Sequence, residues 1–166
     1  STSWVAGMVI KPTDITGLKY YASYKGPAPA MWELTQTDGV LSLVSWGTAS
    51  SGTPRTIVGS TPIVAGTWYK IICYHDGTTM TLYVNGVSIG SVTASPQYVT
   101  TSAVDYNTQA GWLQFGTSRN SSGTQQTAGF IGEMLTCGYW AEGNSTTLST
   151  MNSKLVSYSA AKGLTI

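Results

Sequence analysis

Seven carboxylates and one histidine are the side chains of this sequence best suited to acid–base chemistry. Enzymes that hydrolyse glycosidic bonds need two carboxyl groups held on either side of the bond. No two of the seven are two residues apart, the spacing that would place both side chains on one face of a strand. They are scattered along the chain at Asp14, Glu33, Asp38, Asp76, Asp105, Glu133 and Glu142. We therefore expect no catalytic residue and no enzymatic activity.

The acidic residues and the histidine have structural explanations. Glu133 shares the side-chain parity of Ile131 and Leu135, which predicts that its side chain points inward. A buried carboxyl group with a raised pKa could act as a general acid. Because the sequence offers no acidic partner, a carboxylate hydrogen-bonded to a neighbouring strand or loop is the better interpretation, and the same holds for Glu33. His75 precedes a predicted tight turn, so we expect a turn or surface residue.

The sequence offers little to a metal ion. A single histidine excludes a site built from histidines. Oxygen ligands for calcium are present at Asp105 with Asn107 and at Asp76 with Asn85, although loops and turns favour the same residues for their backbone geometry. We expect no cofactor and no metal, with calcium as the alternative.

The two cysteines, Cys73 and Cys137, lie in predicted strands with apolar neighbours. They allow one disulfide, which an extracellular setting would permit. Because a bridge between strands needs strict Cα spacing, two buried free thiols are the preferred interpretation.

The composition favours binding of a neutral ligand over catalysis. Charged residues are 9% of the chain, against about 25% in an ordinary soluble domain. The 166 residues include 45 Ser and Thr, and 16 of the 18 aromatic residues are Trp or Tyr. A net charge of +1 argues against nucleic acid, and the lack of a long apolar run argues against membrane insertion. We expect an extracellular or virion-surface protein.

Trp and Tyr offer flat apolar surfaces on which sugar rings stack, together with polar groups for sugar hydroxyls. Trp4 and Trp32 have the parity of core residues, whereas Leu113 and Phe115 point inward and so turn Trp112 outward. For each candidate, packing at a sheet rim or in a subunit interface is the alternative. The candidate ligand-binding residues are Trp46, Trp112, Tyr20, Tyr21, Tyr24 and Tyr106, with Gln114, Arg119 and Asn120 for hydrogen bonds.

Short strands separated by turn residues make up most of the chain. Asp76-Gly77 and Asn85-Gly86 join three strands into a meander, and Thr37-Asp38-Gly39 joins two more into a hairpin. The predicted strands span residues 3–11, 18–24, 30–36, 40–46, 56–60, 67–75, 79–84, 87–92, 112–117 and 129–139.

One segment near the C-terminus has helical periodicity. Thr146 or Thr147 is the predicted N-cap, and Gly163 stands where a C-cap glycine belongs. The apolar positions of this helix are Leu148, Met151, Leu155 and Tyr158. A single helix after some ten strands predicts an all-β sandwich of two antiparallel sheets, with the helix laid over an end or edge.

Several segments resemble the laminin-G-like domains of the concanavalin A-like lectin/glucanase superfamily, of the bacterial and phage kind. They are residues 66–72 (GTWYKII), 76–77 (DG), 81–86 (TLYVNG), 129–137 (GFIGEMLTC) and 158–164 (YSAAKGL). The resemblance implies one jelly-roll domain over residues 1–166, with Trp68 at a core position. It also implies glycan binding on a sheet face or at a rim. The E-x-D-x-x-E motif of the superfamily's hydrolases is absent.

These observations lead to one preferred function and two alternatives. We expect a non-catalytic, lectin-like domain that recognises cell-surface glycans as part of a larger surface or phage tail protein. The first alternative is a structural, oligomerisation or virion decoration domain, in which the aromatic residues make subunit contacts. A homo-oligomer is compatible with both functions, and a component of a fibre would form a trimer. A hydrolase with a degenerate site is the second alternative.

Overall fold

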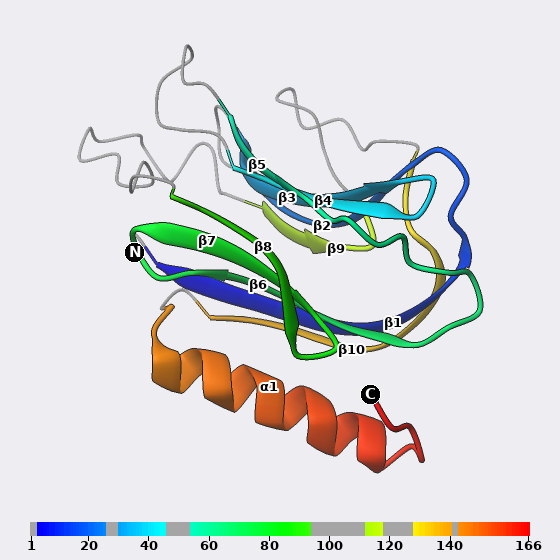
Figure 1. The fold of residues 1–166 in the computed structure, drawn as a ribbon. Helices are drawn as coiled ribbons and strands as arrows, with labels where there is room; N and C mark the ends of the chain where they lie inside the picture. Colours follow the sequence, from blue (N-terminus) through cyan, green and yellow to red (C-terminus); the bar gives the residue numbers. More distant parts are fainter. Residues whose placement is uncertain (1–2, 26–29, 46–53, 94–111, 118–127, 141–142) are drawn as a thin grey trace.

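Two five-stranded antiparallel sheets lie face to face, and one helix lies against the outside of one of them (Figure 1). The computed structural model describes residues 3–25, 30–45, 54–93, 112–117, 128–140 and 143–166. A sheet with one apolar side becomes stable when a second layer covers that side. The architecture confirms the predicted all-β jelly-roll sandwich with a C-terminal helix.

Sheet A combines the first and last strands of the chain with the predicted meander. Its hairpin turn at Asn85 and Gly86 has φ angles of 50° and 84°, the left-handed conformation that a tight hairpin requires. The strands are, in spatial order, β10 (Ile131–Trp140), β1 (Trp4–Asp14), β6 (Tyr69–His75), β7 (Thr79–Val84) and β8 (Val87–Thr93).

Sheet B is built around the second predicted hairpin. Asp38 and Gly39 have φ angles of 50° and 85°, so they turn the chain directly from one strand into the next. The strands are, in spatial order, β5 (Arg55–Val58), β4 (Val40–Ser45), β3 (Ala30–Thr37), β2 (Leu18–Lys25) and β9 (Trp112–Phe115).

Stacked aromatic rings join the two sheets in the main core. Trp4 of sheet A lies on Trp32 of sheet B, with ring centroids 4.7 Å apart and planes 13° from parallel. Both indoles are buried, as their parity predicted. His75 stacks on Trp4 and is fully buried, so it is not a surface residue, but its Nδ1 accepts a hydrogen bond from the Gly77 N–H, which agrees with its prediction as a turn residue. His75 pairs with Trp4 in the β1–β6 register, and the inward alternation of β6 therefore continues to its last residue.

The helix α1 (Ser145–Ala160) covers the outer face of sheet A, which corrects its predicted place over an end or edge of the sandwich. Asn144 is its N-cap and accepts a hydrogen bond from the backbone N–H of Thr147, which corrects the predicted cap by two or three residues. Leu148, Met151 and Leu155 pack on the sheet as predicted. Tyr158 is 57% exposed, because Ser159 takes the buried position one turn after Leu155.

A second, smaller apolar cluster fills the space between α1 and sheet A. Val5, Val9 and Ile72 supply the sheet side of this cluster. Trp68 also packs here, partly exposed, with the Lys11 ammonium 5.4 Å from the centre of its ring. The expectation that Trp68 belongs to the core between the sheets is therefore wrong.

The two cysteines are free thiols on the two strands that flank β1, with Cys73 opposite Ala6 and Cys137 opposite Met8. Cys73 is buried, as predicted, whereas Cys137 is exposed. The exposure of Cys137 follows from its place on β10, the edge strand of the sheet.

The two clusters predict different effects for two tryptophan substitutions. Trp32→Ala should lower the free energy of unfolding by about 3–5 kcal/mol, because it opens a large cavity between the sheets. Trp68→Ala should lower it by only about 1–2 kcal/mol, because part of its ring is already in water. Urea unfolding followed by far-UV circular dichroism measures both. Equal losses would contradict the assignment of Trp68 to the smaller cluster.

Candidate functional site

The outer face of sheet B is the large sheet surface that no described helix covers (Figure 1). Its side chains are mostly polar and form two rows across the strands. One row runs through Tyr20, Thr35, Ser42 and Val58, which are paired from β2 to β5. The other row runs through Gln114, Ser23, Glu33, Val44 and Thr56, which are paired from β9 to β5.

A β-bulge in β2 separates the three tyrosines predicted to act together. The register shifts between Tyr20 and Ala22, so that Tyr21 is the extra residue. Tyr20 therefore faces outward beside Thr35. Tyr21 is fully buried between the sheets and packs on Phe130, which corrects its prediction as a ligand contact.

Tyr24 follows the bulge and also points inward. Its ring stacks on Tyr139 of sheet A with centroids 6.1 Å apart. Burial and the neighbouring Tyr24 raise the pKa of Tyr139 to about 12. Tyr24 thus packs against sheet A while part of its side chain stays exposed, and its role as a ligand contact stays a prediction.

Three polar residues form a shielded part of the outer face. Ser23 is fully buried and Glu33 is 7% exposed, although both lie on the side of sheet B that faces away from the core. The Ser23 Oγ and the Gln114 Oε1 are buried and have no hydrogen-bond partner among the described residues. The two residues are directly opposite each other on β2 and β9. Buried polar atoms without described partners are unusual, and such atoms can bind water or a ligand group, although Trp4, Tyr21 and Trp32 have such atoms in the core as well.

Tyr20 links this shielded part to the open part of the face. Its side chain is partly exposed. Burial raises the pKa of its hydroxyl, and the negative charge of Glu33 raises it further. The neighbouring Thr35 and Ser42 are also partly exposed, so an aromatic ring and two hydroxyls lie next to a carboxylate.

Of the remaining predicted site residues, the structure describes only the backbone of Trp112. Trp112 opens β9 opposite Lys25, and its side chain lies outside the described part of the chain. Trp46, Tyr106, Arg119 and Asn120 lie outside the described residues.

Sequence reasoning missed Ser23, Thr35 and Ser42 as members of the site. The alternation along β3, in which the apolar Trp32 and Leu34 are each followed by a polar residue, Glu33 and Thr35, was the signal that could have found this polar face.

The other described carboxylates have structural roles. Glu133 is exposed on β10 and forms an ion pair with Lys11. The prediction that it points inward is wrong, because its side of β10 faces away from the core. A bulge at Leu135 then reverses the alternation of the strand. Asp38 and Asp76 accept backbone hydrogen bonds at turns.

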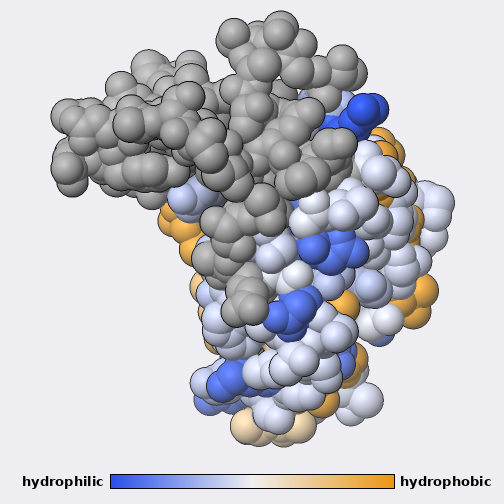
Figure 2. Space-filling model, turned by 90° about the vertical axis from the view of Figure 1, so that its left-hand side faces the viewer, coloured by the Kyte–Doolittle hydropathy of each residue, from blue (hydrophilic) through white to orange (hydrophobic). Residues whose placement is uncertain are grey.

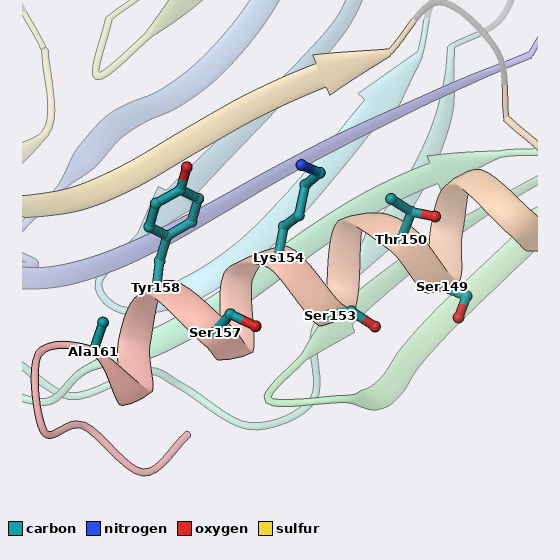
Figure 3. A pocket seen from close by; sticks show the side chains of 7 residues that line it. All are labelled: Ser149, Thr150, Ser153, Lys154, Ser157, Tyr158 and Ala161. Atoms are coloured by element: carbon teal, nitrogen blue, oxygen red, sulfur yellow. The ribbon is translucent and has the colours of Figure 1, made fainter.

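A hollow lies along the solvent side of α1 (Figure 3). Thr150, Lys154 and Tyr158 project from one side of the helix, and three serines project from the other. Six of the seven lining residues lie in this helix and the seventh, Ala161, is its C-cap, so no second element encloses a ligand. At the end of the sandwich seen in Figure 2, the described surface is mostly hydrophilic to neutral, with hydrophobic residues at separated points.

The fold and the motifs agree with a known superfamily. The family model of the concanavalin A-like lectin/glucanases superfamily matches residues 8–136. The chain belongs to this superfamily. No curated protein sequence matches it. Among the described residues, no helix is long and apolar enough to cross a membrane.

Solved structures share the lectin-like fold at low identity. The heptameric SAP-like pentraxin from Limulus polyphemus is 20% identical and has a TM-score of 0.64 over 93% of this chain and 70% of that chain. The CBM40 module of the Ruminococcus gnavus IT-sialidase, solved with alpha2,3 sialyllactose bound, is 12% identical. Its TM-score is 0.67 over 93% of this chain and 80% of that chain.

The ion pair at the end of β1 predicts a loss of stability at low pH. The Lys19 ammonium lies 2.8 Å from Asp14. The hydrogen bond that Lys19 donates, together with the one that the Thr16 N–H donates, lowers the pKa of the Asp14 carboxyl group from 3.8 to about 2. Because the pKa is lower in the folded state, the stabilisation is complete above pH 4 and disappears as the pH falls toward 2. Unfolding midpoints across this range should fall less steeply for Asp14→Asn, and an unchanged slope would contradict the role of this pair.

The unpartnered hydroxyl of Ser23 predicts a stabilising substitution. Ser23→Ala removes a buried polar group that has no described partner, and it should raise the free energy of unfolding by about 1 kcal/mol. Ser91→Ala is the control, because the Ser91 hydroxyl lies 2.9 Å from that of Thr81 and its loss should destabilise the protein. Chemical unfolding measures both, and a destabilised Ser23→Ala variant would mean that the hydroxyl is already satisfied.

Proposed function

We propose that this protein is a non-catalytic glycan-binding domain whose ligand lies on the outer face of sheet B. The observation that carries the proposal is the shielded pair of Ser23 and Gln114, whose buried oxygens have no described partner. A ligand hydroxyl reaching this pair from the open part of the face would satisfy both oxygens. Sugars are rich in such hydroxyls, and the partly exposed ring of Tyr20 offers a surface for a sugar ring.

The remaining predicted contacts extend this proposal along the same face. Alternation along β9 predicts that Trp112 shares the side of Gln114, where its ring would stack on a second sugar. Trp46, Tyr106, Arg119 and Asn120 are proposed as further contacts from neighbouring loops. The CBM40 module with its bound sialyllactose supports the proposal as an example of the same fold binding a glycan.

A binding role is favoured over hydrolysis by the positions of the carboxylates. Asp14 and Glu133 are in ion pairs, and Asp38 and Asp76 hold turns. Among the described residues, Glu33 is therefore the one carboxylate on the proposed face, whereas hydrolysis needs two. We also propose that the domain acts outside the cell or on a virion surface, as part of a larger surface or tail protein.

Substitutions on the two sides of the molecule test the proposal. Tyr20→Ala and Trp112→Ala should each weaken glycan binding about tenfold, because each removes a stacking surface worth about 1.4 kcal/mol. Tyr158→Ala is the matched control, because this exposed tyrosine lies on α1 beneath the other sheet. A glycan array identifies the ligand, and calorimetry measures the affinities. Wild-type affinity in both sheet B variants, with folding intact, would show that the site lies elsewhere.

A further inference from the structure

We propose that a hollow between α1 and sheet A is a second ligand site, which takes a small uncharged molecule of the phenol class, with one flat apolar ring and one polar edge. The inference goes beyond the proposed function, because the hollow lies on sheet A, on the other side of the molecule from the outer face of sheet B. Neither proposal depends on the other.

Two layers of the fold enclose this hollow, unlike the one formed by the helix alone. Helix α1 packs on β10, β1 and β6, and the hollow lies beside it over β6 and β7. The sheet side consists of Ile72 of β6, Tyr83 of β7 and Gly86 of the turn that follows. The volume of the hollow is about 250 Å³. Pockets that hold drug-sized ligands measure roughly 300–1,000 Å³, so this hollow has room for a single ring.

The floor and walls of the hollow are apolar. Ile72 is 2% exposed and belongs to the apolar cluster between α1 and sheet A. Leu148 and Tyr83 pack against the same cluster and are half-buried, so part of each residue still contacts water. A flat ring seated between them would remove this apolar surface from water, and an aromatic ring would also gain from contact with the ring of Tyr83.

The helix side of the hollow has a polar rim. Ser145, Ser149 and Asn152 lie at positions i, i+4 and i+7 of α1, which places them on one side of the helix. Figure 3 shows Ser149 on the side of α1 opposite Tyr158. None of the three rim side chains has a hydrogen-bond partner among the described residues, so their donors and acceptors are open to a ligand.

An apolar floor beside one polar rim fits a phenol better than it fits a sugar. A sugar carries hydroxyl groups around its whole ring, and those that faced Ile72 and Leu148 would lose water without gaining a hydrogen-bond partner. A phenol presents an apolar ring to the floor and a single hydroxyl to the rim. None of the seven lining residues is charged, so a charged group would lose its water without a compensating charge.

Amide chemical shift titrations of the whole chain with phenol test the inference. We expect saturable shifts at Tyr83, Gly86 and Ser149, which line the hollow from both of its sides. Benzoate, which has the same ring and a negative charge, should bind there about tenfold more weakly. Methyl glucoside, which has hydroxyl groups around its ring, should cause no saturable shift at these residues.

Substitutions on one side of α1 locate the bound ring. Ser149→Phe should weaken phenol binding about tenfold, because the new side chain enters the hollow from an exposed position of the helix. Ser153→Phe is the matched control and should leave the affinity unchanged, because Ser153 lies one turn later on the same side and does not line the hollow. Asn152→Ala is a second variant, which leaves the hollow open, removes a polar group from its rim and should weaken binding about fivefold. Far-UV circular dichroism checks that each variant is folded.

The outcomes separate the two proposals. Absence of saturable shifts with phenol, or wild-type affinity in both the Ser149→Phe and the Asn152→Ala variants, overturns the second site and leaves the glycan-binding function in place. Equal binding of benzoate or methyl glucoside at the same residues overturns the assigned class of ligand. Failure of the wild-type protein to bind any glycan overturns the proposed function and leaves the phenol titration as the test of this hollow.

Discussion

The close contact between α1 and Gly7 of β1 determines which outer face of the sandwich the helix covers. A Cβ atom at Gly7 would lie 2.8 Å from Met151 and 2.9 Å from Leu155, so the helix lies nearer to the sheet than a larger residue would allow. The apolar face of α1 and the outer face of sheet A are thereby buried together. Sheet A is covered on both sides, and the outer face of sheet B remains to bear polar side chains.

Local irregularities in the strands then decide which side chains reach that face. The bulge at Tyr21 turns one tyrosine of β2 into the core and leaves Tyr20 outside. The stacked rings of Trp4 and Trp32 hold the two sheets in place behind it. A rigid sheet backed by a packed core fixes the spacing of Ser23, Glu33 and Gln114, which suits recognition of a ligand without movement of the backbone.

The pairing of strands in local hairpins was predictable from the sequence, because the two residues of an Asp-Gly or Asn-Gly turn favour tight hairpin geometry. The core positions of Trp4 and Trp32 followed from simple alternation. The bulges in β2 and β10 were not predictable, since each depends on pairing with strands distant in the chain. In β2, a shift of one residue in the strand register turned the side chains of Tyr21 and Tyr24 inward. In β10, the bulge at Leu135 reversed the side-chain alternation in the later part of the strand. Of the predicted ligand contacts, Tyr20 and Gln114 therefore lie on the outer face of sheet B, whereas Ser23 on the same face was not predicted, and their role in binding stays a proposal.

Amide chemical shift mapping during titration with a glycan that binds on the array tests the central claim most directly. The account predicts that the largest shifts fall on Tyr20, Ser23, Glu33, Thr35, Ser42 and Gln114, with small changes along α1. Shifts concentrated on α1 and the outer face of sheet A, with those of sheet B unchanged, would contradict it.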